Sequence, residues 1–239
     1  SSVFGNFKPK TFKIYKESKK VPKLYIPIYY FLETISNTHK TIVNFKFKDR
    51  ITSNFLKGGV DSIELRPKQL ECFEKCKEIK EQEYGGGIIN CSTAFGKTVT
   101  ALKIACYFGY KSIIVVNKIE LIDQWKREIK KWYPNVRIGI IQGDKFDIEN
   151  KDIILAMLQT VSLKGSLGVK DLSSFTVGFI DEIHNIGSEM FSQIMFKLRP
   201  RYLFGLTATL ERKDKLEKII KWYIGDILYS DTNLLGTKK

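Results

Sequence analysis

The segment from residue 88 to residue 108 constrains the fold more than any other part of the chain. A short apolar run over 88–91 is followed by a loop that ends in Gly96, Lys97 and Thr98, and then by a helical pattern over 98–108. A strand, a glycine-containing loop and a helix in this order bring backbone N–H groups and a helix N-terminus to one point, which favours phosphate binding. The segment therefore predicts an α/β fold with a phosphate site.

The loop itself predicts which atoms would meet a triphosphate. Thr93, Ala94 and Phe95 would wrap the phosphates together with Gly96, and Lys97 would reach the β- and γ-phosphates of ATP. The Thr98 hydroxyl would ligate Mg²⁺. The strict form of this motif has glycine at position 91, where this chain has cysteine, and a fortuitous Gly-Lys-Thr at a helix start is the alternative interpretation.

Strand and helix patterns alternate along the rest of the chain from about residue 61. Buried strands are predicted over 88–91, 112–116, 138–141, 153–157, 177–180 and 203–206, and helices over 67–80, 98–108 and 120–132. Glycines 85–87 are expected to form a flexible turn, with a phosphate-binding nest as the alternative. The alternation predicts a parallel sheet with helices on both faces.

Residues 1–60 form a separate, small and β-rich module in this interpretation, and residues 61–239 form the main domain. Phe12, Ile14, Phe45 and Phe47 alternate with lysines, and the β-prone stretch 24–31 contains Pro27, which indicates an edge strand or an irregular one. The paired glycines at 58–59 mark the boundary.

The charge of the chain points to a polyanionic partner. Its formal net charge is +14, and residues 1–60 carry 12 Lys and Arg against 3 Asp and Glu. A basic module with interleaved aromatics favours contact with nucleic acid, although the same lysines would also suit a solubilising face and the aromatics a small core.

The four cysteines indicate a reducing compartment rather than a metal or disulfide site. Cys72 and Cys76 are spaced for neighbouring turns of one helix, and no Cys-x-x-Cys pair occurs in the sequence. No apolar run is long enough for a membrane span, so no membrane partner is expected and the predicted location is the cytoplasm, with the nucleus as an alternative. Trp125 and Trp132 share one helix face, where core packing is favoured over base stacking.

Two acidic residues end the predicted strand 177–180. A carboxylate at the carboxyl end of a parallel strand faces the ligand crevice, so Asp181 is predicted to bind Mg²⁺ through water. Glu182 is then placed to orient and deprotonate an attacking water. A lone histidine is more often structural, but His184 in this segment is expected to couple the site to another one.

These motifs together resemble the DExH type of superfamily 2 helicases over roughly residues 61–229. Within that superfamily the chain is similar to XPB-like helicases and to helicases of large cytoplasmic DNA viruses, such as the poxvirus transcript-release helicase. The segments that carry the resemblance are Leu65-Arg66-Pro67-Lys68-Gln69, Val115-Val116-Asn117-Lys118 with Leu121 and Gln124-Trp125, Gly139-Ile140-Ile141-Gln142-Gly143, Met157-Leu158-Gln159-Thr160 and Gly205-Leu206-Thr207-Ala208-Thr209-Leu210. Tyr25 and Pro27 are similar to the N-terminal module of the viral members.

The resemblance implies a RecA-like sheet and assigns roles to further residues. Gln69 would hydrogen-bond adenine, and Arg66 would lie near the nucleotide. Thr207 and Thr209 would link the ATP site to a bound strand. Three residues would line the backbone of that strand without reading its sequence, namely Lys118, Gln159 and Thr160.

The implied function is that of an ATP-binding motor lobe in a nucleic-acid-dependent ATPase. A 3′-to-5′ DNA helicase or translocase linked to transcription is favoured, in the cytoplasm or a virion if the protein is viral. An RNA-directed DExH helicase and a nucleotide-controlled nucleic-acid-binding scaffold are the alternatives. XPB carries Arg-Glu-Asp where this chain has Arg212-Lys213-Asp214, which separates this chain from XPB itself.

Enzymes of this kind use two RecA-like lobes, and only the first is recognised in these residues. The sequence is therefore expected to be the N-terminal portion of a larger enzyme. Because arginine fingers from the other lobe contribute about 10³–10⁵ in turnover, these 239 residues alone are expected to hydrolyse ATP barely above background. A steady-state ATPase assay checks this, and clear stimulation by nucleic acid would contradict it.

Overall fold

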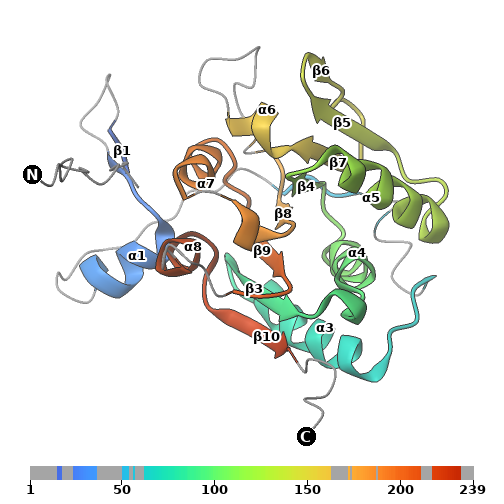
Figure 1. Cartoon of the computed structure of the whole chain (residues 1–239), viewed down its shortest axis with the longest axis horizontal. Coiled ribbons are helices and arrows are strands. Elements are labelled where there is room, and N and C mark those ends of the chain that lie inside the picture. The colour runs from blue at the N-terminus through green and yellow to red at the C-terminus, as the bar shows by residue number, and fades with distance from the viewer. Residues whose placement is uncertain are drawn as a thin grey trace, which may run out of the picture.

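The computed structural model describes residues 15–17, 24–36, 50–53, 56, 62–162, 172, 174–186, 188–210 and 217–232. Most of them belong to a domain built on one eight-stranded sheet, which helices cover on both faces (Figure 1). The sheet is parallel except for its last strand, which pairs antiparallel. In spatial order its strands are β10 (Ile227–Asp231), β3 (Gly85–Cys91), β9 (Tyr202–Thr207), β8 (Val177–Ile180), β4 (Ser112–Val116), β7 (Ile153–Met157), β5 (Ile138–Gln142) and β6 (Lys145–Phe146).

Two apolar cores sandwich this sheet. One face packs against α3 (Pro67–Lys80), α4 (Lys97–Phe108) and α5 (Ile119–Trp132), and the other against α6 (Leu158–Ser162), α7 (Ser188–Met195) and α8 (Glu217–Ile224). In β4, Ile114 and Val116 join the first core and Ile113 and Val115 the second. Because both faces are buried, the central strands read as continuous apolar runs, and the predicted α/β class is confirmed.

The strand predictions in this domain are confirmed, with one error at the start of β3. Glycines 85–87 were expected to form a loop, but they are buried in the strand and pair with β9. A Cβ on Gly86 would lie 2.0 Å from the carbonyl oxygen of Leu203. These glycines therefore allow a close approach of two backbones, a use that composition alone does not distinguish from a turn.

The described part of the N-terminal region contains both strands and helices. β1 (Lys16–Glu17) pairs antiparallel with β2 (Leu24–Tyr25), and the chain continues into α1 (Ile28–Tyr30) and a π-helical stretch, η1 (Phe31–Ser36). The strand predicted over 24–31 is thus wrong beyond Tyr25, because the fixed φ of Pro27, −58°, starts a helix. The predicted alternation at Phe12, Ile14, Phe45 and Phe47 lies outside the described residues.

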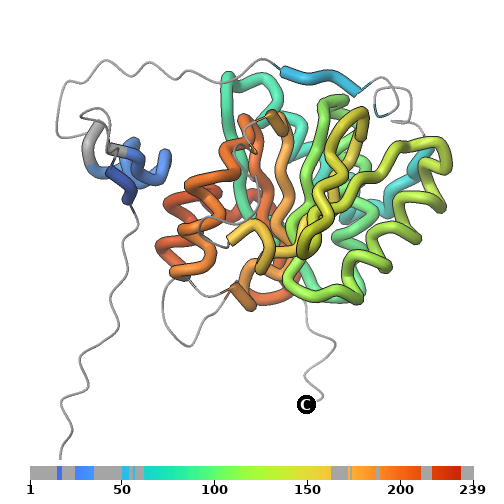
Figure 2. Tube along the Cα trace, turned by 90° about the horizontal axis from the view of Figure 1, so that it is seen from above, coloured from blue at the N-terminus to red at the C-terminus, as the bar shows by residue number. Residues whose placement is uncertain are grey.

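Two stretches from residues 1–60 contact the main domain. α1 lies beside α8, where the Tyr30 ring meets Trp222 edge-on with centroids 4.8 Å apart (Figure 1). Residues 50–53 run along the amino-terminal edge of the sheet (Figure 2) and bridge to Tyr110, while Leu56 is fully buried in the first core. The domain boundary at residue 60 stays a prediction, but Leu56, on the N-terminal side of that boundary, belongs to the core of the main domain.

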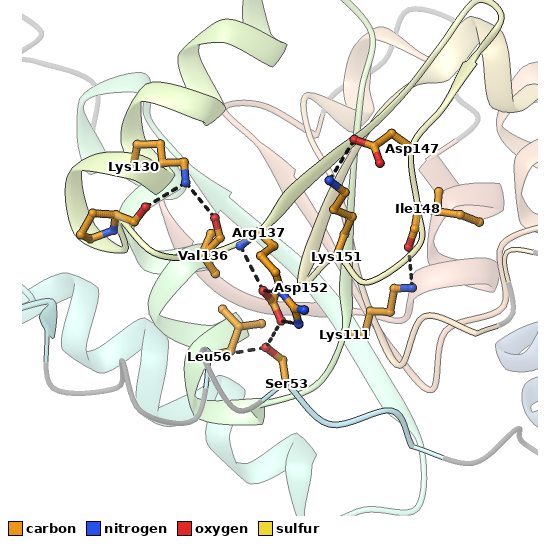
Figure 3. A network of polar contacts seen from close by, with 11 residues as sticks. Ser53, Leu56, Lys111, Lys130, Val136, Arg137, Asp147, Ile148, Lys151 and Asp152 are labelled. Carbon is orange, nitrogen blue, oxygen red and sulfur yellow. Dashed lines mark hydrogen bonds and ion pairs between the residues drawn. The ribbon is translucent and has the colours of Figure 1, made fainter.

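Asp152 fastens this segment to the sheet edge. Its carboxylate accepts hydrogen bonds from the Ser53 hydroxyl at 2.8 Å and from the backbone N–H of Arg137 at 3.0 Å, and it also pairs with the Arg137 guanidinium at 3.0 Å (Figure 3). Burial alone would raise the pKa of Asp152. The hydrogen bonds from Arg137 and Ser53 outweigh burial and hold the pKa below its ordinary value of 3.8.

Replacing this carboxylate is expected to loosen the edge. Asp152→Ala should lower the free energy of unfolding by about 3 kcal/mol, because the Ser53 hydroxyl and the Arg137 N–H lose their acceptor and each such buried group costs about 1–3 kcal/mol. Urea denaturation measures this. Asp147→Ala is the matched control, because Asp147 forms a partly exposed pair with Lys151 in the same region (Figure 3) and should cost less than about 1 kcal/mol.

The same contact gives a pH dependence. Because folding depresses the pKa of Asp152, its ionised form stabilises the fold fully above the ordinary value of 3.8, and this contribution is lost as pH falls through the lowered value. The stability difference between the unaltered protein and Asp152→Ala should therefore shrink below about pH 4. A difference that stays constant from pH 7 to pH 3 would contradict this assignment.

Candidate nucleotide-binding site

The carboxyl ends of four neighbouring parallel strands bring the predicted motifs to one edge. β3 ends at the loop that begins with Ser92, β9 ends at Thr207, β8 ends just before Asp181, and β4 ends just before Asn117. Segments that are more than 100 residues apart in sequence therefore meet at this edge. In open α/β sheets this edge is where ligands bind.

The loop between β3 and α4 is short and tightly folded. Thr93, Ala94 and Phe95 form one turn of 3₁₀ helix, η3 (Thr93–Phe95), and α4 begins directly after Gly96. Gly96 has φ +87°, a left-handed backbone conformation that residues other than glycine rarely adopt. Phe95 is buried against the ring of Tyr229, whereas Thr93 and Ala94 are exposed. Thr98 lies in the first turn of α4 and is partly buried.

Lys97 is buried beneath this loop. Only 7% of it is exposed, and its ammonium donates to the carbonyl oxygens of Cys91 at 2.9 Å and Ser92 at 3.3 Å. A buried charge is costly unless it is paired, and here loop carbonyls satisfy it. The same ammonium can turn to phosphate oxygens that enter at the N-terminus of α4.

Arg66 and Gln69 hold the loop from the side of α3. The Gln69 amide donates to the carbonyl oxygen of Phe95 at 2.8 Å, and its oxygen accepts the backbone N–H of Arg66 at 2.9 Å. The Arg66 guanidinium donates to the carbonyl oxygens of Ala94 and Phe95. The structure thus places both residues beside the loop. The adenine contact of Gln69 and the place of Arg66 near the nucleotide stay predictions.

Asp181 and Lys97 lie on the same side of the sheet. Burial raises the pKa of Asp181 above its ordinary range, the hydrogen bond from Trp125 opposes the rise, the charge of Glu182 adds to it, and the charge of Lys97 opposes it. The Trp125 indole N–H donates to Oδ2 of Asp181 at 2.8 Å. Trp125 is 1% exposed, so the core prediction for it is confirmed and base stacking is excluded. Its contact with Asp181 was not foreseen.

Glu182, His184 and Thr207 form a polar chain across β8 and β9. Glu182 has φ +51°, which turns the chain sharply into η4 (Ile183–Asn185). Nδ1 of His184 lies 3.2 Å from a Glu182 carboxylate oxygen and 2.9 Å from the Thr207 hydroxyl. That hydroxyl donates to the carbonyl oxygen of Thr209. The coupling residues predicted from sequence are therefore brought into contact.

The residues predicted to line a nucleic-acid strand lie farther along the same edge. Lys118 is exposed just before α5, and Gln159 is exposed and donates to the carbonyl oxygen of Asn117 at 3.0 Å. Thr160 is buried, and its hydroxyl accepts the backbone N–H of Gly143 at 2.9 Å, so this side chain supports a turn. Direct contact of the three residues with a strand stays a prediction.

Comparison with known proteins decides the family. The family described as "Type III restriction enzyme, res subunit" (ResIII) matches residues 62–212, which contain every motif described above. The chain belongs to the ResIII family of helicase domains. This membership confirms the resemblance to superfamily 2 helicases.

Curated relatives of this helicase domain include viral and archaeal proteins. A putative ATP-dependent RNA helicase of Acanthamoeba polyphaga mimivirus is 33% identical over 69% of this chain and 31% of its own length. The DNA 3′-5′ translocase XPB2 of Sulfurisphaera tokodaii is 35% identical over 71% of this chain and 36% of its own length. The chain spans about a third of the length of the first curated relatives that it matches.

Solved structures show the same fold at lower identity. The UvsW helicase of bacteriophage T4 matches 85% of this chain and 78% of its own with a TM-score of 0.59 at 16% identity. The Sulfolobus solfataricus SWI2/SNF2 ATPase core in complex with dsDNA matches 76% of this chain and 38% of its own with a TM-score of 0.56 at 19% identity. The helicase domain thus has a RecA-like core fold.

The side chains of this helicase domain fit a nucleotide and magnesium. The N-terminus of α4 and the Lys97 ammonium suit phosphate oxygens, and the Thr98 hydroxyl and the Asp181 carboxylate are the hard oxygen donors that Mg²⁺ prefers.

Among helices of the described residues, none has both the length and the apolar character that spanning a bilayer requires.

Gly96 is a sharp test of this loop geometry. A Cβ there would lie 2.5 Å from Nε2 of Gln69, in addition to the cost of a positive φ. Gly96→Ala is expected to weaken ATP binding by about tenfold or more, since the backbone strain alone is about 1–2 kcal/mol. Titration with a fluorescent ATP analogue measures the affinity.

Gly143→Ala is the matched control for this substitution. Gly143 also has a positive φ, +55°, but a Cβ there would meet no atom within 4 Å. Both substitutions carry the cost of a positive φ, and Gly96→Ala, whose Cβ would also meet Gln69, should lose more stability in thermal unfolding. Only Gly96→Ala should lose affinity for ATP. Equal losses of affinity in the two variants would contradict the loop's role.

Proposed function

We propose that this chain is the ATP-binding motor lobe of a nucleic-acid-dependent ATPase, a superfamily 2 DNA helicase or translocase. One observation carries the proposal. Lys97, Asp181 and the contact chain from Glu182 through His184 to Thr207 converge at one edge of a parallel sheet. Membership of a helicase family and the phosphate loop beside these residues support it.

The residues of this edge divide the work of ATP hydrolysis. Lys97 would leave the carbonyl oxygens of Cys91 and Ser92 and bind the β- and γ-phosphates. Thr98 and Asp181 would hold Mg²⁺, which neutralises charge on the phosphate oxygens. Glu182 would orient the attacking water and accept its proton. Because the Lys97 ammonium already donates to two carbonyl oxygens, phosphate binding would replace these carbonyl oxygens with phosphate oxygens.

The contacts of His184 supply a path by which the site could report its state. A proton accepted by Glu182 changes the charge 3.2 Å from Nδ1 of His184, which in turn contacts the Thr207 hydroxyl. Thr207 is bonded to Thr209 at the start of the next loop. Lys118 and Gln159 would contact the strand backbone at the same edge, which is the sequence-independent contact that a translocating motor needs.

The names of the relatives support a proposal for the nucleic-acid substrate and for the larger protein to which this lobe would belong. The XPB2 translocase acts by name on DNA in the 3′-to-5′ direction, and another relative is the XPB subunit of a basal transcription factor complex in Trypanosoma brucei brucei. We therefore favour DNA, that polarity and a link to transcription, together with a second RecA-like lobe. The basic N-terminal residues 1–60 would add contacts to phosphates, in a reducing compartment such as the cytoplasm.

Two other functions are the alternatives to a DNA motor, and experiments can separate them from it. The name of the mimivirus relative points to RNA, so an RNA-directed helicase is the second candidate. ATPase stimulation by single-stranded DNA against RNA of the same sequence, measured on a protein with both lobes, separates these two. A scaffold that only binds nucleotide is the third, and it differs from both in needing no hydrolysis.

Glu182→Gln separates a motor from a scaffold. In a protein with both lobes, this substitution should leave ATP affinity within about threefold and reduce turnover by about 10²–10⁴, because the amide keeps the shape of the carboxylate but cannot accept the proton. Radiolabelled ATP hydrolysis and strand-displacement assays measure the loss. Glu189→Gln, on an exposed position of α7, is the control. The scaffold interpretation predicts that the full-length protein keeps its biological activity with Glu182→Gln, whereas a motor loses that activity while it still binds ATP. Full strand displacement by Glu182→Gln would contradict the role assigned to Glu182.

A further inference from the structure

A hydrogen bond links Trp125 of α5 to Asp181 at this edge. The indole N–H and Oδ2 of Asp181 lie 2.8 Å apart, and both residues are buried, with 1% and 7% of their surfaces exposed. The two residues are 56 positions apart in sequence. Because both groups are buried, water competes little for this hydrogen bond, and the bond fixes the indole and the carboxylate relative to each other.

The two oxygens of Asp181 are held by different groups. Oδ2 accepts the Trp125 indole, and Oδ1 accepts the backbone N–H of Glu182 at 3.0 Å. The backbone N–H of Asp181 itself donates to the carbonyl oxygen of Val115 in β4. Because each end of the carboxylate has its own donor, the rotation of the carboxylate plane is restrained. Without the indole, only the adjacent backbone amide would set its orientation.

The indole is itself rigidly placed. Ile122 and Ile129 lie on the same side of α5 as Trp125, and all three are buried in the first core. Trp132, seven residues on, is only partly buried, and its indole donates to Glu128 in the same helix at 3.3 Å. Two tryptophans of one helix therefore differ in what their N–H groups hold, and only one of them touches the site.

We propose that Trp125 is a positioning residue that orients the Asp181 carboxylate for magnesium. The inference rests on the proposed function, since it assigns Asp181 to the metal. Donors to a metal-binding carboxylate typically change metal affinity 10–100-fold when they are removed. A buried indole also needs an acceptor in any fold, so a purely structural role is the competing explanation. The two explanations differ in whether magnesium dependence changes.

The first experiment compares Trp125→Phe with Trp132→Phe in this chain. Each keeps an aromatic ring and removes one indole N–H. A fluorescent N-methylanthraniloyl ATP analogue, excited directly, is titrated with and without Mg²⁺. Trp125→Phe should require about tenfold more Mg²⁺ for the same nucleotide affinity and bind the magnesium-free nucleotide as the unaltered chain does. Trp132→Phe should match the unaltered chain in both. The same Mg²⁺ requirement in the two variants would overturn the proposal.

The second experiment keeps Trp125 and removes the other two tryptophans. The chain has three tryptophans, so Trp132→Phe combined with Trp222→Phe leaves Trp125 as the only one. Its emission should shift when Mg²⁺ is added to the ATP-bound protein, and the shift should vanish in the same protein with Asp181→Asn. No change on addition of Mg²⁺, while the fluorescent analogue shows magnesium-dependent binding, would overturn the proposal even if Trp125→Phe does not fold.

The controls distinguish a failure of this inference from a failure of the proposed function. If the unaltered chain binds no nucleotide with Mg²⁺ present, the proposed function fails and this inference fails with it. If the unaltered chain binds nucleotide with Mg²⁺ dependence and Trp125→Phe shares that dependence, only the inference fails. Thermal unfolding of the two phenylalanine variants shows whether a loss of stability accompanies either result.

Discussion

The parallel pairing of β3, β9 and β8 is the constraint on which the site depends. Asn90 pairs with Thr207, and Gly205 pairs with Ile180, so the three strands run in one register to a common edge. A parallel pair cannot be closed by a tight turn and needs a crossover, so each strand delivers a loop to the same edge after its helix has returned. This pairing brings Asp181 and Thr207 to the same edge of the sheet as the phosphate loop.

Burial decides how the charges of this edge behave. Lys97 and Asp181 are each more than nine-tenths buried, and both are paired within the protein, Lys97 by loop carbonyls and Asp181 by an indole and a backbone amide. Glu182 is partly exposed and pairs with His184. Both groups thus have hydrogen-bond partners before any ligand is present, although burial still raises the pKa of Asp181. A ligand that binds here must offer at least equivalent partners.

The sequence predicted the parts of this structure that local pattern controls. Residues 153–157 and 177–180 are apolar runs of strand length, and they are strands with the predicted bounds. Pairing between strands that are distant in sequence is not visible in a local pattern. The glycines at 85–87 therefore predict a turn, although they pair with β9, which requires their small size. The strand predicted over 24–31 was wrong for a similar reason, because a proline such as Pro27 suits both the end of a strand and the start of a helix.

The same limit explains which site residues were found. Lys97, Asp181 and His184 belong to contiguous motifs whose spacing carries their chemistry, and the structure brings them together. Trp125 carries no such spacing toward Asp181, since its partner lies 56 residues away and on another element. Its helical position next to a core face predicted burial correctly. Only the packing of α5 against β7 and β4, beside the end of β8, shows where its N–H points.

Residues outside the phosphate loop itself also shape it, and they hold it between two supports. On one side Gln69 and Arg66 of α3 bind its carbonyl oxygens. On the other side the backbone N–H of Ser92 donates to the carbonyl oxygen of Asp231 in β10, a strand that sequence patterns did not predict. Lys68 joins the two supports through its ion pair with the Asp231 carboxylate at 3.0 Å. The loop is therefore held in shape by the edge strand as well as by its own glycine, so its geometry is a property of the folded domain rather than of the motif.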